Sequence, residues 1–186
     1  MSRDKIKEVA IQHFNHYGYR GTSLSKIAAE VGIRKQSLAY HFPNKCELFQ
    51  NVYKEVVEKE INFVQNYFQE NQDKQLDEQL YNFLSLHKER FLSDHNATLM
   101  LTTTLQTPEG IPKDILEAPY RFIRILTETL KSCFQKESFR LSAEDCALAF
   151  VTLIDGLNIQ LVYEDKERYE RLQKITWDIF WSGIQK

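Results

Sequence analysis

The sequence predicts an all-α protein, and three observations support that prediction. Apolar residues recur at a period near 3.6 along most of the 186 residues. Only four Pro and six Gly are present, too few for a fold built from many β-turns. No internal repeat or low-complexity tract interrupts the pattern. The length fits a small N-terminal domain followed by one larger helical core, or a single medium domain.

The segment 22–45 predicts two short helices joined by a tight turn. One apolar face of the first helix is formed by Leu24, Ile27, Ala28 and Val31. Ser23 is a suitable N-cap, and Gly32 can end the helix in the left-handed conformation. The second helix, about 35–41, directs Leu38 inward and polar side chains outward. This pair is typical of a helix-turn-helix DNA reader, although a helical hairpin that merely packs has the same pattern.

The residues around this pair strengthen the DNA-binding interpretation. The segment 5–19 predicts a preceding helix that Gly18 ends, with an apolar stripe formed by Ile6, Val9, Ala10 and Phe14. Residues 1–50 hold eight Lys or Arg and four Asp or Glu, whereas residues 51–186 hold sixteen and twenty-two. The formal net charge is −2, yet positive charge is concentrated beside the helix-turn-helix.

Residues 6–49 follow the pattern IxxxAxxxFxxxGYxGTSLxxIAxxVGIxxxSLxYHFxxKxxLF. This pattern resembles the N-terminal domain of the tetracycline-repressor (TetR) family. The resemblance implies an all-α homodimer, with a DNA-binding domain at 1–46 and a helical regulatory and dimerisation domain at 47–186. The chain also resembles, to a more limited extent, the repressors of staphylococcal adhesion-polysaccharide operons. This resemblance lies in the length and in the connection Gln106-Thr107-Pro108-Glu109.

The expected partner is a double-stranded operator, most simply an inverted repeat, contacted by Ser23, Ser25, Arg34, Lys35, Gln36, Ser37, Tyr40, His41 and Lys45. At the start of the second helix, Lys35 and Gln36 are expected to reach base edges, Lys at guanine and Gln at adenine. Ser37 and Tyr40 are expected at a phosphate or a thymine methyl group, and His41 at a phosphate.

Other contacts are expected to position the protein on the DNA backbone. The hydroxyls of Ser23 and Ser25 lie near a helix N-terminus and can meet the backbone without reading sequence. Lys45 resembles the lysine that commonly holds a phosphate in this family. Ala39 departs from the family pattern, which usually has an aromatic residue there, so a ring contact to the backbone is in doubt.

Further helices are predicted at about 45–70, 76–93, 97–105, 113–136, 142–163 and 166–184. Asn44 and Glu47 form a capping-box-like start for the first of these, which would span about 39 Å. Pro119 lies inside a predicted helix and is expected to kink or split it. The segment 107–112, with two prolines, is expected to be a connector.

The family resemblance implies a small-molecule effector held between the middle helices. The expected lining residues are Phe63, Tyr67, Phe83, His87, Phe91, Met100, Thr103, Thr104 and Phe122. Their composition favours a hydrophobic or aromatic ligand. A plainly packed core would have the same spacing, so this alternative stays open.

The last two helices are too apolar for single-sided surface helices of a monomer. In TetR-like proteins they pair with a second subunit as a four-helix bundle. The expected interface residues are Phe150, Ile154, Leu157, Leu161, Trp177, Phe180 and Trp181. The alternative is that these helices pack only within their own subunit.

An enzyme is disfavoured because no HExxH, GxSxG, P-loop or dinucleotide motif accompanies the five histidines. We therefore expect no catalytic residue, no metal and no cofactor, and we interpret His13 and His16 as a solvated helix face. The presence of Lys35, Tyr40, His41 and Lys45 argues against a protein–protein adaptor that has lost DNA binding.

Cys46, Cys133 and Cys146 lack CxxC spacing, which favours free thiols in a reducing cytoplasm over disulfides or zinc; redox sensing is the alternative. No charged-then-apolar leader and no run of eighteen apolar residues is present. We expect a cytoplasmic protein that does not enter the membrane.

Overall fold

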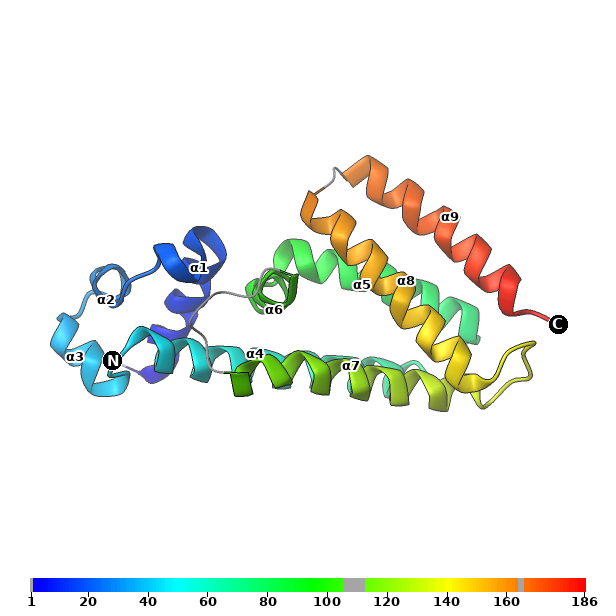
Figure 1. The fold of residues 1–186 in the computed structure, drawn as a ribbon, viewed down its shortest axis with the longest axis horizontal. Coiled ribbons are helices and arrows are strands. Elements are labelled where there is room, and N and C mark those ends of the chain that lie inside the picture. Colours follow the sequence, from blue (N-terminus) through cyan, green and yellow to red (C-terminus); the bar gives the residue numbers. More distant parts are fainter. Residues whose placement is uncertain (1, 106–112, 164–165) are drawn as a thin grey trace. The chain divides into compact units, whose positions relative to one another are not determined.

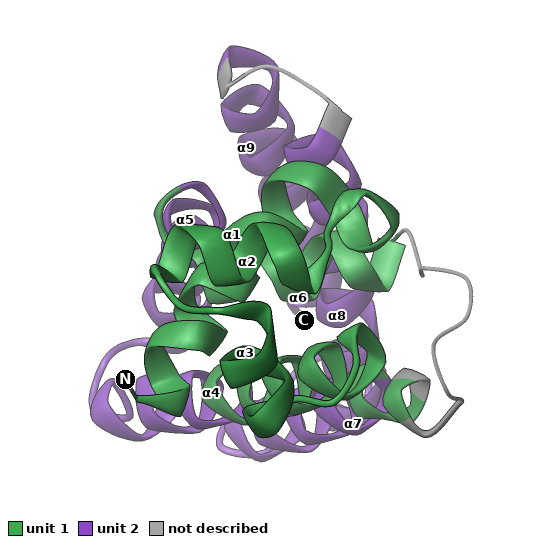
Figure 2. Cartoon of the chain, turned by 90° about the vertical axis from the view of Figure 1, so that its left-hand side faces the viewer, with its two compact units in different colours: residues 1–60, 93–119 green, residues 61–92, 120–186 purple. Residues whose placement is uncertain are grey.

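The computed structural model describes residues 2–105, 113–163 and 166–186, and the regular structure of these residues is entirely helical (Figure 1). The all-α prediction is confirmed. The chain divides into two compact units, coloured separately in Figure 2. Unit 1 comprises residues 1–60 and 93–119, and unit 2 comprises residues 61–92 and 120–186. These units are defined by which residues pack together and not by function. The functional boundary expected between residues 46 and 47 therefore stays a prediction.

Unit 1 begins with α1 (Arg3–Gly21), α2 (Leu24–Val31) and α3 (Lys35–His41). Each of the first two helices starts at a serine whose hydroxyl accepts a backbone N–H of the first turn. Ser2 accepts from Lys5 and Ser23 accepts from Lys26, both at 3.3 Å. These bonds satisfy donors that have no partner inside the helix. The N-cap predicted at Ser23 is confirmed.

Two glycines with positive φ shape this region. Gly18 has φ 65° and ψ 174°, so it interrupts the helical backbone within α1, where the sequence predicts a helix end. Gly32 has φ 79° and closes α2 in the left-handed conformation, as predicted. The N–H of Ile33 then donates to the carbonyl of Ala28 at 2.9 Å, which ties the turn back to the helix.

The predicted apolar faces of these helices are buried. The buried side chains are Ile6, Val9, Ala10, Phe14, Ile27, Ala28, Val31, Leu38 and Phe42. An aromatic cluster continues this packing onto the next helix: Phe14 meets Phe49 edge-on at 4.9 Å between ring centroids, and Tyr19 meets Phe49 at 5.1 Å. The α1–α2–α3 group is therefore joined to the following helix by rings as well as by the chain.

That following helix, α4 (Lys45–Glu70), has the predicted bounds. Its start is a reciprocal capping box, as predicted. The N–H of Glu47 donates to Asn44 Oδ1 at 2.9 Å, and Asn44 Nδ2 donates to Glu47 Oε1 at 2.9 Å. Lys45–Glu60 belong to unit 1 and Ile61–Glu70 to unit 2.

Unit 1 is completed by α6 (His95–Leu105), which lies far along the chain from α1. Asn15 Nδ2 donates to the carbonyl of His95 at 2.9 Å. Lys59 Nζ donates to Asn96 Oδ1 at 3.2 Å. These bonds hold the start of α6 to both α1 and α4.

Unit 2 contains most of α5 (Leu76–Ser93), part of α7 (Lys113–Phe134), and all of α8 (Ala143–Tyr163) and α9 (Lys166–Ile184). Its core gathers apolar side chains from all of these helices, including Leu80, Phe83, Leu126, Leu130, Phe134, Cys146, Phe150, Ile154 and Tyr169. By length and composition the segment Ala143–Val162 could cross a membrane. Cys146, Ala147 and Phe150 in this segment are buried in the core of unit 2, whereas Leu148 and Ile159 are exposed.

Two expectations about the middle of the chain end differently. The connector at 107–112 and the Gln106–Glu109 connection lie outside the described residues. The split that was one outcome expected at Pro119 is wrong, because α7 continues as one helix from Lys113 to Phe134, and the kink that was the other outcome stays a prediction. A proline removes one intrahelical hydrogen bond, and here Ile115, Leu126 and Leu130 are buried on either side of it and hold the helix by packing.

Replacing Asn44 by Ala should lower the free energy of unfolding by about 1 kcal/mol, since the first turn of α4 loses its cap. The matched control is Asn66→Ala, the same substitution at an exposed position within α4. It should raise stability by a few tenths of a kcal/mol through helix propensity. Urea denaturation measures both, and equal effects of the two variants would contradict the capping argument.

Candidate DNA-binding interface

The exposed surface of α3 carries the polar residues predicted to read DNA. Arg34, Lys35, Gln36 and Ser37 are exposed, and the side chain of Tyr40 is 87% exposed. His41 is partly buried, with its ring edge-on to that of Tyr40 at 5.6 Å between centroids. These side chains share one short helix, so together they form a candidate reading surface.

The opposite side of α3 anchors it to unit 1. Leu38 is 0% exposed and Phe42, at the end of the helix, is 1% exposed. The guanidinium carbon of Arg3 lies 4.7 Å from the centroid of the Phe42 ring, and Arg3 also donates to Asn51 Oδ1 at 3.2 Å. An arginine from α1 therefore covers the anchor of α3 with a cation–π contact.

The two predicted serines have different surroundings. The Ser23 hydroxyl caps α2, so its oxygen is already engaged with the N–H of Lys26. Ser25 is exposed on the first turn of α2. Lys26 Nζ lies 5.1 Å from the Tyr17 ring centroid and donates to the carbonyl of Gly21 at 3.4 Å.

The α1–α2 turn is held by buried polar bonds. Thr22 is 2% exposed, and its hydroxyl lies within hydrogen-bond distance of two carbonyls, at 2.8 Å from Gly18 and 3.0 Å from His13. His13 is 5% exposed, and its Nε2 lies 2.6 Å from Oε2 of Glu30 on α2. The orientation of α2 on α1 therefore depends on polar contacts as well as on apolar packing. The expectation of a solvated helix face is therefore wrong for His13, which is buried against Glu30, whereas His16 is exposed.

Lys45 lies at the start of α4, beside the same turn. Its Nζ donates to the carbonyls of Tyr19 at 2.6 Å and Thr22 at 3.0 Å. It also lies 4.3 Å from the Tyr19 ring centroid. Partial burial lowers the pKa of Lys45. The phosphate contact expected for Lys45 stays a prediction.

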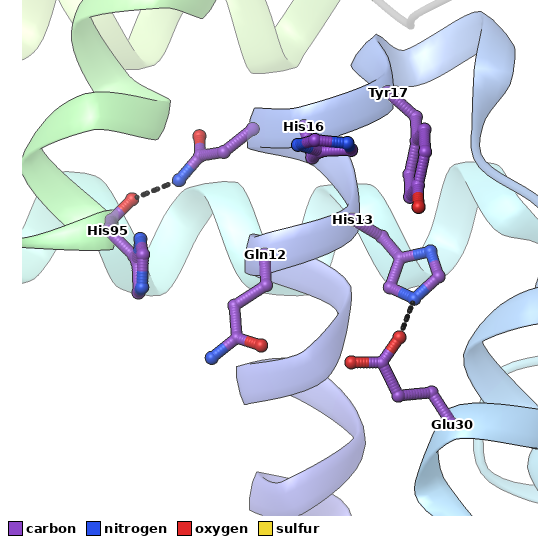
Figure 3. A pocket seen from close by; sticks show the side chains of 7 residues that line it. Gln12, His13, His16, Tyr17, Glu30 and His95 are labelled. Carbon is purple, nitrogen blue, oxygen red and sulfur yellow. Dashed lines mark hydrogen bonds and ion pairs between the residues drawn. The ribbon is translucent and has the colours of Figure 1, made fainter.

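A surface hollow of about 540 Å³ lies beside this region (Figure 3). It is lined by Gln12, His13, Asn15, His16, Tyr17, Glu30 and His95. Figure 3 shows His95 well separated from the His13–Glu30 pair, so the titratable groups do not converge on one point. Within the described ranges, no group of three or more His, Cys, Asp and Glu side chains is arranged to hold a metal ion.

The residues expected to line a ligand pocket divide between the two units. Met100, Thr103 and Thr104 belong to unit 1, and the other six belong to unit 2. In unit 2 the rings of Tyr67 and Phe63 lie 5.3 Å and 6.1 Å from that of Phe83. A ligand pocket formed by all nine residues therefore stays a prediction.

Polar groups accompany these rings. His87 Nε2 donates to Oδ1 of Asn158, which is 8% exposed, at 2.7 Å. Burial is the main cause that lowers the pKa of His87; the Asn158 bond opposes it and the Arg90 charge adds to it. The Arg90 guanidinium carbon lies 3.9 Å from the Phe63 ring centroid. Asn158 and Arg90 were missed by sequence reasoning, since neither follows an apolar pattern.

The predicted dimer residues lie mostly inside their own subunit. Phe150, Ile154 and Leu157 are 0–4% exposed in the core of unit 2. The other four are partly buried against it: Leu161, Trp177, Phe180 and Trp181. The predicted interface itself is untested. The apolar side chains open to solvent on these helices are Leu148 (50%), Ile159 (45%), Ile175 (43%) and Ile179 (69%).

Comparison with known proteins identifies relatives of this architecture. A model of the family described as bacterial regulatory proteins, tetR family, matches residues 6–52. The biofilm operon icaADBC HTH-type negative transcriptional regulator IcaR of Staphylococcus epidermidis is 30% identical over 153 residues, 82% of this chain and 77% of its own. The regulator of the same name from Staphylococcus aureus (strain Newman) is 25% identical over 170 residues, 88% of this chain and 86% of its own.

Solved structures share the fold over nearly the full length. FadR from Bacillus subtilis, in complex with stearoyl-CoA, has a TM-score of 0.71 at 22% identity and covers 99% of this chain and 100% of its own. The structure of a transcriptional regulator from Saccharomonospora viridis, in complex with choline, has a TM-score of 0.73 at 21% identity. The match covers 99% of this chain and 97% of that one.

An all-α chain with a helix-turn-helix and an exposed, polar second helix defines a DNA-binding transcriptional regulator. The match to the family model and the relative at 30% identity identify the family of regulators to which it belongs. The chain belongs to the tetR family of bacterial regulatory proteins. The family predicted from residues 6–49 is confirmed.

The depressed pKa of His87 makes stability depend on pH. Between its folded and ordinary pKa the unfolded chain binds more protons, so the free energy of unfolding falls as pH drops below about 6.5. The loss is at most about 1.4 kcal/mol per pH unit within that window. Urea titrations at several pH values should show a flatter dependence for His87→Gln, whereas exposed His16→Gln should behave as wild type. An unchanged dependence in His87→Gln would contradict the assignment.

Proposed function

We propose that this regulator is a homodimeric cytoplasmic repressor that binds an inverted-repeat operator and is released from it by a small hydrophobic or aromatic ligand. The observation that carries the proposal is the exposed polar face of α3, fixed to unit 1 by Leu38 and Phe42. The names of the staphylococcal relatives, which describe negative transcriptional regulators, support repression over activation.

In this proposal Lys35 and Gln36 enter the major groove. Gln36 pairs with an adenine edge, and Lys35 reaches O6 or N7 of a guanine. Ser37, Tyr40 and His41 contact phosphates or a thymine methyl group, and Ser25 meets the backbone at the start of α2. All of these side chains except the partly buried His41 are exposed in the free protein, so little has to be rearranged on binding.

A two-fold operator needs two recognition helices and therefore two copies of the chain. We assign the interface between the two copies to α8 and α9. Exposed Leu148, Ile159, Ile175 and Ile179 support this assignment, because burying aliphatic side chains against a second copy removes apolar surface from water. The helices α8 and α9 also pack on each other, so one partner could cover both.

Release by a ligand is supported by the neighbours solved with stearoyl-CoA and with choline. A ligand that binds the DNA-incompetent state better must lower DNA affinity by the same factor by which DNA lowers ligand affinity. The aromatic rings of Phe63, Tyr67 and Phe83 favour an apolar or flat ligand for this chain.

The Gln36→Ala variant tests direct reading of sequence. It should cost about 1–3 kcal/mol at one or two base pairs of the chain's own promoter and leave affinity for scrambled duplex unchanged. The matched control is Gln65→Ala, at an exposed position on α4, which should change neither. Titrations at physiological salt measure the affinity of the wild type and of each variant for both duplexes. Equal wild-type affinity for promoter and scrambled DNA would contradict the proposed function.

The Ile179→Glu variant tests the dimer. A charge at this exposed side chain should leave the monomer folded, but it would place an unpaired carboxylate in the seam between copies. Sedimentation equilibrium should show a shift from dimer to monomer, and operator affinity should fall with it. The control is Leu92→Glu, at a side chain that is 62% exposed at the end of α5. A wild-type chain that sediments as a monomer at micromolar concentration would contradict this assignment.

A further inference from the structure

One residue of α1 contacts both ends of α2. The Thr22 hydroxyl, just before α2 begins, lies 3.0 Å from the backbone carbonyl oxygen of His13. At the other end, Nε2 of the His13 ring lies 2.6 Å from Oε2 of Glu30, the penultimate residue of α2. Figure 3 shows this ring directed from α1 toward the Glu30 carboxylate. Contacts at both ends fix the direction of a short helix, whereas a contact at one end would let it swing.

The imidazole of His13 depends on Glu30 for its hydrogen bonding. The ring is buried, and its Nδ1 has no hydrogen-bond partner in the part of the chain that the structure describes. An ionised carboxylate can only accept, so Nε2 carries the hydrogen that is donated to Glu30. Without that acceptor, the second ring nitrogen would also be buried and unsatisfied, which destabilises the folded state.

The apolar side of α2 cannot fix its orientation as closely. That side consists of Ile27, Ala28 and Val31 on a helix of eight residues. Apolar burial is non-directional, so these side chains tolerate a small rotation of the helix about its axis. A hydrogen bond weakens steeply as its angle departs from linear. Replacing a buried polar pair by apolar side chains of similar volume is often neutral for stability, so the contribution of this pair is direction.

The orientation of α2 is passed to the reading helix through a short turn. Residues 32–34 alone separate α2 from α3. The N–H of Ile33 donates back to the carbonyl of Ala28 at 2.9 Å, and α2 and α3 pack on each other. A rotation of α2 therefore moves α3, and with it Lys35 and Gln36.

We propose, on the basis of the DNA-binding function proposed above, that His13 and Glu30 are positioning residues for operator recognition. Their hydrogen bond sets the orientation of α2, and through it the angle at which α3 enters the major groove. The pair acts through α3 and touches no phosphate. It therefore governs the affinity for the correct sequence and not the affinity for DNA in general.

The test compares Glu30→Gln with Glu30→Met. Both remove the same charge, but only the glutamine keeps an oxygen that can accept from Nε2 of His13. The readout is the affinity for the chain's own promoter divided by that for scrambled duplex, at a temperature where every variant is folded. Glu30→Met should lower this ratio about 10-fold, the scale of one misplaced base contact, and Glu30→Gln should keep it within about twofold. A wild-type ratio in Glu30→Met, or an equal fall in both variants, would overturn the proposal.

A double-variant cycle separates positioning from stability. His13→Leu removes the buried ring together with its need for an acceptor. Its thermal unfolding midpoint should stay within about 3 °C of wild type, while the affinity ratio falls about 10-fold. Combining His13→Leu with Glu30→Met should cause no further fall, since the hydrogen bond is already absent. Exposed His16→Leu is the control and should change neither quantity. Additive losses in the combined variant, or a wild-type ratio in His13→Leu, would contradict the assignment.

A measurement on the free protein keeps the role of the pair separate from the proposed function. Amide hydrogen exchange over residues 35–41, read by mass spectrometry, should be faster in Glu30→Met than in Glu30→Gln, because α3 is held less firmly. Equal exchange in the two variants would overturn the proposal. If the wild-type chain bound its own promoter no better than scrambled duplex, the proposed function would fail, whereas the exchange rates would still decide the role of the pair.

Discussion

The surface proposed to read DNA depends on the burial of two side chains. A helix of seven residues, such as α3, is far too short to be stable alone in water. Leu38 and Phe42 supply the packing that holds it, at 0% and 1% exposure. Lys35, Gln36 and Tyr40 are presented outward because the opposite side of the same helix is fixed. Any loss at this anchor would remove the reading surface without touching a residue that meets DNA.

The anchor is in turn supported by polar contacts that converge on the α1–α2 turn. Gly18 interrupts the helical backbone of α1, the Thr22 hydroxyl lies within hydrogen-bond distance of the Gly18 and His13 carbonyls, and His13 contacts Glu30 of α2. Lys45 adds the start of α4 to the same turn. These contacts therefore hold α1, α2 and the start of α4 together, and the burial of Leu38 and Phe42 holds α3 to them.

Local signals in the sequence were sufficient for much of this description. Ser23, Gly32 and the Asn44–Glu47 pair act on neighbours within four residues, so helix starts and ends could be predicted without knowing the fold. The same holds for the buried side of α3, because Leu38 is the one large apolar residue among polar neighbours.

Contacts between distant residues could not be predicted in this way. The partners of Lys45 and His13 lie 17 to 26 residues away, and Asn15 meets His95 across 80 residues. The apolar pattern of α8 also failed to identify its outer side. Hydrophobic residues surround most of that helix, so Phe150 and Leu148 look alike in the sequence although one is buried and the other is half exposed. At Pro119 the helix is not split, and Ile115, Leu126 and Leu130 are buried on either side of it.

In the proposed complex, two copies of the α3 surface enter two successive major grooves. Hydroxyl-radical footprinting of the promoter beside the gene shows whether this happens. We expect two protected half-sites, related by a two-fold axis and centred about 10 base pairs or a multiple of that apart, on one face of the duplex. A single protected half-site, or uniform weak protection along the whole fragment, would contradict it.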